Sequence, residues 1–163
     1  MAKITKQLTG TGVAIVTPFT KEGKVDFPAL VKLIGHIVKG KCEYLVPLGT
    51  TGESVVLSDA EYYDVLSCTL ECANGKIPVV AGLGGNNTTA VLKKLEDPIF
   101  EQVSAILSVS PYYNKPNQQG IQRHYRAIAD QSPVPVILYN VPGRTGSNVQ
   151  VDTTLELAKH KNI

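Results

Sequence analysis

Short runs of apolar, often β-branched residues alternate along this chain with longer segments whose apolar residues recur at helical spacing. This alternation constrains the fold more than any other feature. The apolar runs cover residues 13–16, 44–48, 77–81, 105–109 and 134–139. Each is nearly continuous in apolar residues, which is typical of strands buried on both faces of a parallel sheet. The chain therefore predicts an α/β fold in which a strand and a helix repeat five times.

Helix signals fill the segments between these runs. The expected helix starts are Asp26, Ser58, Thr88 or Thr89, and Asp152, and the remaining helix is marked by the i, i+4, i+7 spacing of Ile121, Tyr125 and Ile128. Ser58 and Glu61 form a capping box, in which a hydroxyl and a carboxylate satisfy free backbone N–H groups reciprocally. Pro98 is expected to end the third helix early.

Repeated strand–helix units build either a doubly wound open sheet or a closed barrel, and periodicity does not choose between them. The chain has 163 residues, whereas a complete eight-stranded barrel typically needs roughly 250. No linker, low-complexity tract or block of charge divides it, so residues 1–163 are expected to form one α/β domain.

Charge and hydropathy argue against several classes of function. The net charge is +2, and Lys and Arg are spread along the chain, so no surface for nucleic acid is expected. No apolar run approaches the length of a membrane span, and the first ten residues, MAKITKQLTG, lack the apolar core of a signal peptide. A cytoplasmic protein without membrane contact is therefore expected.

The cysteines favour packing over metal binding. Cys42, Cys68 and Cys72 are odd in number and lack the spacing of a disulfide framework. Cys68 and Cys72 would share a helix face, but a zinc site needs more ligands than these two. We therefore expect no metal site and interpret the thiols as small apolar side chains in packed helices.

Polar and glycine-rich clusters directly follow the apolar runs. The five clusters are Thr17-Pro-Phe, residues 49–53 (GTTGE), residues 82–87 (GLGGNN), residues 110–116 (SPYYNKP) and residues 139–146 (YNVPGRTG). In α/β folds of either kind, ligands bind at the carboxyl ends of the strands. Five such loops on one rim therefore predict a binding or catalytic site.

Three of these loops admit a structural as well as a functional interpretation. Thr50 and Thr51 are suited to holding a carboxylate, although the glycines beside them are also what a tight turn requires. The 82–87 segment lacks the third glycine of a dinucleotide-binding loop and the lysine of a P-loop, so it indicates close backbone approach to a ligand rather than a phosphate site. Tyr112 and Tyr113, between stiffening prolines, are typical of a partner-binding surface as well as of chemistry.

The fifth cluster is the most informative. Tyr139 ends an apolar strand, so its ring is expected to be partly buried with the hydroxyl at the mouth of the site. Arg144 follows five residues later in a Pro-Gly turn, and a planar guanidinium on a rigid loop suits bidentate capture of a carboxylate. We expect both side chains to converge with the two threonines on one pocket.

The chain resembles the dihydrodipicolinate synthase (4-hydroxy-tetrahydrodipicolinate synthase) family in five segments: GTGVAIVTPF, GTTGE, VVAGLGGNNT, PYYNKP and YNVPGRTG. The similarity runs from about Leu8 to the last residue, in the same order and spacing. It implies a (β/α)8 TIM barrel, of which this chain would supply about five strand–helix units. It also implies a homotetramer assembled as a dimer of dimers.

The resemblance implies a Schiff-base lyase of lysine and diaminopimelate biosynthesis that needs no cofactor. Family members condense pyruvate with aspartate 4-semialdehyde: a barrel lysine forms an imine with pyruvate, and the derived enamine attacks the aldehyde. By resemblance, Thr51 helps to bind the pyruvate carboxylate and Arg144 binds that of the semialdehyde. Tyr139 would donate and accept protons, and Thr50 would link its hydroxyl to that of Tyr113, which is contributed across the dimer interface.

The imine-forming lysine of the family is absent from these 163 residues. By resemblance it lies on the sixth strand, in a stretch similar to I-K-E, a few residues beyond the position of Ile163. Lys159 and Lys161 are expected near the end of the fifth helix, where a solvated amine stays protonated and is not nucleophilic. We therefore expect an incomplete barrel that lacks the sixth to eighth strands and is inactive alone.

Other functions stay open on the residues alone. N-acetylneuraminate lyase and the ketodeoxygluconate or hydroxyoxoglutarate aldolases share the lysine and tyrosine mechanism, but Arg144 and the double threonine favour the synthase. A non-catalytic α/β module that binds a phosphate or nucleotide is a second alternative. An inert half-barrel that dimerises through Tyr112 and Tyr113 is a third.

Overall fold

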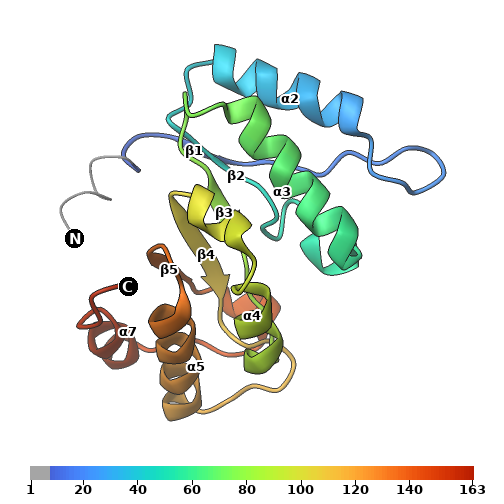
Figure 1. The fold of residues 1–163 in the computed structure, drawn as a ribbon. Helices are drawn as coiled ribbons and strands as arrows, with labels where there is room; N and C mark the ends of the chain where they lie inside the picture. Colours follow the sequence, from blue (N-terminus) through green and yellow to red (C-terminus); the bar gives the residue numbers. More distant parts are fainter. Residues whose placement is uncertain (1–7) are drawn as a thin grey trace. The chain divides into compact units, whose positions relative to one another are not determined.

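The computed structural model describes residues 8–163 and has the alternating strand–helix order that the sequence predicts (Figure 1). In chain order the elements are β1 (Gly12–Ala14), α2 (Phe27–Lys39), β2 (Tyr44–Val46), η1 (Ser54–Val56), α3 (Asp59–Ala73), β3 (Val80–Gly82), α4 (Thr88–Lys94), η2 (Pro98–Gln102), β4 (Ala105–Val109), α5 (Gln118–Gln131), β5 (Val136–Tyr139), α6 (Pro142–Thr145) and α7 (Val151–Leu157), where η denotes a 3₁₀ helix. Residues 1–7, on which the expected lack of a signal peptide partly rests, lie outside the described part.

The described chain divides into two compact units. The N-terminal unit contains residues 8–82 and Gln102–Ser104, and the C-terminal unit contains Leu83–Glu101 and Ala105–Ile163. Each unit is built from parallel strands with helices packed beside them, which is the α/β construction expected from the alternating pattern.

Strands β1 and β2 of the N-terminal unit pair in parallel, with Val13 opposite Leu45. A further parallel bridge joins Leu45 to Val79, just before β3. Helices α2 and α3 pack against each other. The core of this unit includes Leu30, Ile34, Leu45, Val65 and Leu66, none of which is more than 1% exposed.

Side-chain caps fix the starts of α2 and α3. Asp26 accepts the N–H of Ala29 at 2.9 Å. Ser58 Oγ accepts the N–H of Glu61 at 3.3 Å, while the Glu61 carboxylate accepts the N–H of Ser58 at 2.9 Å. The bonds from Ser58 hold the pKa of the Glu61 carboxyl below its usual range. The predicted capping box is therefore confirmed.

Strands β4 and β5 of the C-terminal unit pair in parallel, and α5 packs against both α4 and α7. The predicted stripe of Ile121, Tyr125 and Ile128 is confirmed, since all three side chains are fully buried. One cluster of this core consists of Ile121, Tyr125, Val149 and Leu157, with Leu138 and Ile163 packed against it.

Two strands begin later than the sequence predicts, and both begin after a proline. β3 starts at Val80 instead of residue 77, and β5 starts at Val136 instead of residue 134. Pro78 and Pro135 have no N–H to donate to a ladder, which explains the shorter strands. The first strand, expected at residues 13–16, covers Gly12–Ala14.

α4 begins at Thr88, one of the two predicted starts, and Asn87 caps it by accepting the N–H of Ala90 at 3.2 Å. α4 ends at Lys94, before Pro98 as expected. α7 begins one residue before Asp152.

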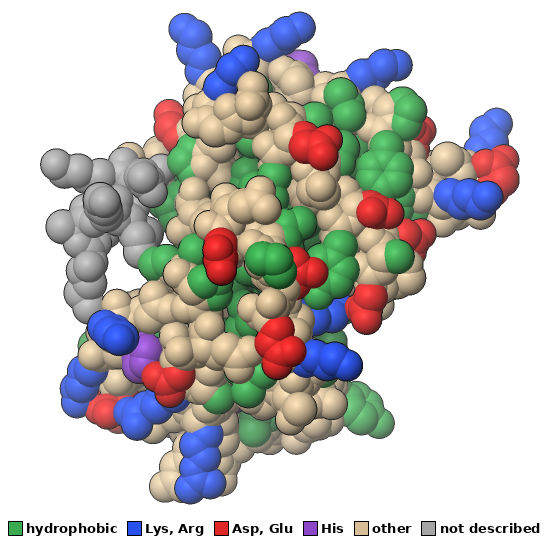
Figure 2. All heavy atoms as spheres, in the orientation of Figure 1, with side chains coloured by type: hydrophobic (Ala, Val, Ile, Leu, Met, Phe, Trp, Pro, Cys, Tyr) green, Lys and Arg blue, Asp and Glu red, His purple; other side chains and the backbone are tan. Residues whose placement is uncertain are grey.

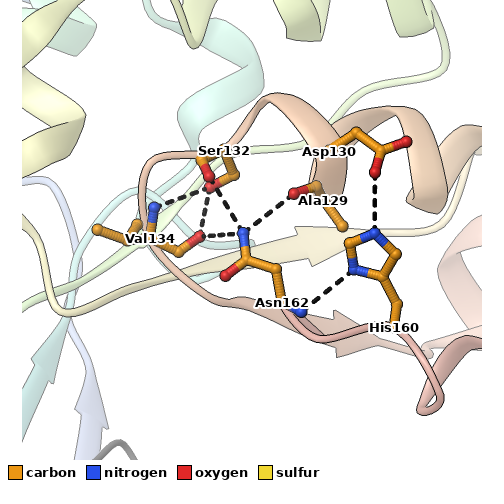
Figure 3. Close-up of polar contacts among 6 residues, drawn as sticks. All are labelled: Ala129, Asp130, Ser132, Val134, His160 and Asn162. Atoms are coloured by element: carbon orange, nitrogen blue, oxygen red, sulfur yellow. Dashed lines mark hydrogen bonds and ion pairs between the residues drawn. The ribbon is translucent and has the colours of Figure 1, made fainter.

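The C-terminal segment is tied to the end of α5 and the start of β5 by Asn162 (Figure 3). Its side-chain Nδ2 donates to the carbonyls of Ala129, Ser132 and Val134 at 3.0, 3.1 and 3.1 Å, and its own carbonyl accepts the N–H of Val136 at 2.9 Å. His160 supports it: Nδ1 accepts the N–H of Asn162 at 3.2 Å, and Nε2 lies 2.9 Å from Asp130 Oδ1. This segment is therefore positioned by side-chain hydrogen bonds as well as by packing.

The surface carries charges of both signs. Acidic and basic side chains are interspersed on the face drawn in Figure 2. Within residues 8–163, no helix is long and apolar enough to cross a membrane, and no three His, Cys, Asp or Glu residues gather as metal ligands. Cys42, Cys68 and Cys72 are free and partly buried. Burial, together with the neighbouring Cys72, raises the pKa of the Cys68 thiol to about 11, so Cys68 stays protonated.

Candidate functional site

The loop of residues 48–52, named here the threonine loop, follows β2 in the N-terminal unit. Leu48 is 1% exposed and takes a left-handed φ of 61°, which turns the chain out of the strand. The N–H of Gly52 donates to the carbonyl three residues earlier at 3.1 Å and closes the turn. The backbone is thus held inside, while the side chains of Thr50 and Thr51 are exposed at the end of a strand.

Buried hydroxyls support the threonine loop from the ends of the two strands beside β2. Thr17, which follows β1 and is 4% exposed, donates its hydroxyl to the Gly52 carbonyl at 2.7 Å. On the other side, Gly82 at the end of β3 donates its N–H to the Pro47 carbonyl at 2.9 Å. Tyr62 of α3 donates its hydroxyl to the Gly82 carbonyl at 2.7 Å. Burial raises the pKa of Tyr62 far above its usual value, so the phenol stays a neutral donor.

The close backbone approach expected at residues 82–87 occurs at Gly82, but the neighbour is the protein itself. A Cβ atom on Gly82 would lie 2.3 Å from the carbonyl oxygen of Leu48. Only glycine therefore allows the end of β3 to lie this close to the threonine loop. The expectation of a ligand at this glycine gains no support from the contact.

Tyr139 and Arg144 lie in the C-terminal unit, where the fifth strand ends. Tyr139 is the last residue of β5, stands opposite Val109 and is partly buried, as expected. Its carbonyl accepts the N–H of Ser110 at 3.3 Å, which joins the ends of β4 and β5. Arg144 is exposed in the single turn of α6, where its N–H donates to Val141 at 2.9 Å.

The loop of residues 140–149, named here the arginine loop, is closed at its base by two asparagines. Asn140 donates its Nδ2 to Asn148 Oδ1 at 2.8 Å, and Asn140 Oδ1 accepts the N–H of Val149 at 3.1 Å. Gly146 takes a left-handed φ of 68° and allows the chain to turn back. Arg144 thus lies inside a loop whose two ends are hydrogen-bonded together.

Gln118, the first residue of α5, ties this loop to the helix layer. Its Nε2 donates to the carbonyl of Asn148 at 2.9 Å. Its Oε1 accepts the N–H of Gln150 at 3.1 Å and the hydroxyl of Thr153 at 2.7 Å. Gln118 carries no signal in the sequence, because its partners lie 30 to 35 residues further along the chain.

The tyrosine loop, residues 110–116, reaches the arginine loop through Lys115. A Cβ on Gly146 would lie 2.7 Å from Lys115 Cε, so the lysine stem lies directly over this glycine. Tyr113 is 87% exposed and, like Lys115, has a positive φ. This backbone conformation is uncommon for residues other than glycine, and the Tyr113 ring lies in solvent.

The structure thus places the predicted site residues in two groups. Thr50 and Thr51 belong to the N-terminal unit, and Tyr113, Tyr139 and Arg144 belong to neighbouring loops of the C-terminal unit. The convergence of the threonines with Tyr139 and Arg144 on one pocket stays a prediction. Thr17 could be found from the sequence by its place after the first apolar run, whereas Tyr62 and Gln118 lie within helices and carry no such signal.

A family model described as the dihydrodipicolinate synthetase family matches residues 7–163. The chain belongs to this family. It is 53% identical over 155 residues to the 4-hydroxy-tetrahydrodipicolinate synthase of Flavobacterium psychrophilum, a match that covers 94% of the chain and 53% of that relative. It is 49% identical over 152 residues to the enzyme of the same name from Parabacteroides distasonis, covering 93% of the chain and 51% of the relative.

Solved structures of the family share the fold. The chloride-inhibited dihydrodipicolinate synthase from Acinetobacter baumannii, complexed with pyruvate, matches with a TM-score of 0.91 and 42% identity, over 94% of this chain and 53% of that one. The synthase from Thermotoga maritima matches with a TM-score of 0.91 and 39% identity, over 96% and 53%. The predicted fold class, a partial (β/α)8 barrel, is therefore confirmed. The chain spans about half the length of the relatives it matches.

Proposed function

We propose that this chain supplies the first half of the active site of a 4-hydroxy-tetrahydrodipicolinate synthase, a lyase that condenses pyruvate with aspartate 4-semialdehyde through a lysine imine. One observation carries the proposal: Tyr139 stands partly buried at the end of β5, and Arg144 follows it in a loop closed by side-chain hydrogen bonds. Relatives named for this activity are 46 to 53% identical over nearly the whole chain, which supports it. We further propose that both units belong to one catalytic domain of a cytoplasmic protein.

The threonine loop would bind pyruvate and take part in proton transfer. Thr51 would donate a hydrogen bond to the pyruvate carboxylate, and an exposed hydroxyl at a strand end suits that task. The bond from Thr17 to Gly52 would hold the loop in place without substrate, so little ordering is needed on binding. Thr50 would pass protons between the hydroxyls of Tyr139 and a partner's copy of Tyr113.

Tyr139 would transfer a proton during the reaction, and Arg144 would bind the second substrate. Imine formation joins the amine to the pyruvate carbonyl carbon and releases water, and loss of a methyl proton gives the enamine. The enamine carbon then bonds to the aldehyde carbon, and Tyr139 would protonate the resulting alkoxide. The amine of the semialdehyde would next attack the imine carbon, closing the ring and releasing the lysine. Arg144 would hold the semialdehyde carboxylate throughout.

The lysines near the end of the chain do not match the needs of the imine. Lys159 is 74% exposed and pairs with Glu156, and Lys161 is exposed as well. An amine becomes nucleophilic at neutral pH when it is desolvated or placed beside another cation. Neither of these two side chains is desolvated, and the Lys159 ammonium lies against a carboxylate. The proposal therefore places the imine on a lysine outside these 163 residues.

The proposal can be tested by joining residues 1–163 to the second half of the Flavobacterium psychrophilum relative. The joined protein should give a borohydride-trapped pyruvate adduct on one lysine and should consume aspartate 4-semialdehyde. Tyr139→Phe should lower kcat about 100-fold, because the proton donor is lost. Replacing Tyr63, a partly buried tyrosine on α3, with Phe is the matched control and should leave kcat unchanged.

Each alternative gives a different result in the same experiment. An imine with turnover of N-acetylneuraminate or a ketodeoxy sugar acid, and none of the semialdehyde, would indicate a sibling aldolase. A folded protein that forms no imine would contradict the proposed class. Stabilisation by nucleotides without an imine would favour the binding module instead.

We also propose that the protein assembles into dimers through the tyrosine loop. Tyr113 is 87% exposed and held in a strained conformation, which suits insertion into a second copy. One solved neighbour, which is 39% identical, is described as a monomeric dihydrodipicolinate synthase variant, so the oligomeric state of this chain needs its own measurement.

A further inference from the structure

Arg144 is exposed, but the loop around it is held at three points. The asparagine pair closes the base of the arginine loop, and Lys115 covers Gly146. The third point is Gln118, which reaches the loop from the first turn of α5. An arginine side chain in solvent samples many rotamers, so the fixed position of its backbone decides where the guanidinium is available.

Gln118 provides hydrogen bonds that only a primary amide of this length supplies together. Its nitrogen donates to the Asn148 carbonyl, and its oxygen accepts from the Gln150 N–H and from the Thr153 hydroxyl. A glutamate would keep the acceptor but lose the donor, and an aliphatic side chain would lose all three bonds.

The first turns of α5, which carry Gln118, are held in place by packing and hydrogen bonds. Ile121 and Tyr125, one and two turns further along α5, are fully buried, and the Tyr125 hydroxyl donates to the Ser108 carbonyl at 3.0 Å. Asn117 caps the helix by accepting the N–H of Gly120 at 2.9 Å. The Gln118 side chain therefore fixes the end of the arginine loop relative to α5.

We propose that Gln118 is a positioning residue for Arg144: it fixes the arginine loop so that the guanidinium meets the carboxylate of the aldehyde substrate. The assignment of that carboxylate rests on the proposed function, whereas the control of the loop by Gln118 does not. Two measurements separate these parts.

The first measurement is amide hydrogen exchange on the 163-residue chain. In Gln118→Leu, the amides of Val149 and Gln150 should exchange about 10-fold faster, because the bonds that restrain this end of the loop are lost. In Gln118→Glu, which keeps the acceptor oxygen, the Gln150 amide should stay close to its original rate. Gln119→Leu, an exposed neighbour on the same helix, is the control and should change neither amide.

Wild-type exchange at both amides in Gln118→Leu would overturn the proposal. If Gln118→Leu does not fold, Gln118→Glu decides the matter: equal exchange at the Asn148–Val149 segment in this variant and in the wild type would overturn it too.

The second measurement is steady-state kinetics in the joined protein described above. Gln118→Leu should raise the KM for aspartate 4-semialdehyde about 10-fold and leave the KM for pyruvate and the rate of imine trapping unchanged. A general loss of structure would change all three, and that result would contradict a positioning role. If Arg144→Leu itself leaves the semialdehyde KM unchanged, the proposed role of Arg144 fails, while the exchange comparison still decides the role of Gln118.

Discussion

At the scale of single residues, buried polar side chains hold this protein together by reaching backbone far along the chain. The hydroxyls of Tyr62 and Tyr125 donate to carbonyls 20 and 17 residues away, and both rings are buried. His124 is the exception: Nδ1 lies 2.8 Å from the Thr88 hydroxyl, but Nε2 is buried without a partner among the described residues. A charge on this ring would therefore be poorly solvated.

This burial makes stability depend on pH. Burial lowers the pKa of His124 to about 4, against roughly 6.5 for a free histidine. The unfolded chain then binds more protons between these values, so stability is complete above about pH 6.5 and falls as the pH drops towards 4. Between pH 7 and pH 5 the free energy of unfolding should fall by about 2 kcal/mol from this residue, as measured by urea titration.

His124→Asn, which can keep an acceptor near Thr88, should remove most of this pH dependence. His36→Asn, at an exposed position on α2, is the control and should retain the pH dependence. The same slope in His124→Asn and in the wild type would contradict the assignment.

The places of the candidate residues at the ends of strands were predictable from the sequence, whereas their roles stay a proposal. Tyr139 stands out because it ends an apolar run, and Thr50 and Arg144 because they follow one, since ligands bind at the carboxyl ends of strands. Gln118 was not predictable, because a glutamine at a helix start is ordinary and its partners come from the next strand–helix unit. Such a contact exists only after the chain has folded.

At the scale of elements, local signals predicted the helices better than the strands. The capping box at Ser58 and Glu61 is a contact over three residues, and it is present as predicted. Strand ends depend instead on a partner's ladder, and prolines with no N–H shortened β3 and β5 in a way that apolar composition does not show. Asn162 shows most clearly that element ends depend on distant partners, because its side chain joins the end of α5 to the turn before β5.

Asn162→Asp should destabilise the C-terminal unit. The substitution removes the Nδ2 donor and places a carboxylate against the carbonyls of Ala129, Ser132 and Val134. The free energy of unfolding should fall by about 2 kcal/mol in urea titration. Lys161→Ala, at the exposed position beside it, should change the midpoint little, and an unchanged midpoint in Asn162→Asp would contradict the role given to the amide.

At the scale of the whole molecule, the α/β class followed from the alternation of apolar runs and helical segments, but the barrel did not. Periodicity left an open sheet and a closed barrel equally possible, and the choice came from resemblance and then from solved relatives. The reason is physical, because closure depends on the tilt and stagger of all the strands together and leaves no mark in any one of them.

Assembly belongs to this scale as well. If dimers form through the tyrosine loop, Tyr113→Ala should shift the protein towards monomers in sedimentation velocity, because an exposed ring that fills a partner's pocket contributes strongly to an interface. Tyr63→Ala, on α3, serves as the comparison. Equal sedimentation of Tyr113→Ala and the wild type would argue against this interface.

The absence of a side chain at Gly146 affects the electrostatic potential of the arginine loop. Because the stem of Lys115 lies over it, a second cation is kept within the loops that carry the Arg144 guanidinium, with its ammonium left in water. Two positive charges on one small area attract small anionic acids from a distance, and dissolved ions weaken that attraction over about 8 Å at physiological ionic strength. If the proposed function holds, capture of the acidic substrate should therefore slow as salt is added, even where every contact in the bound state is unchanged.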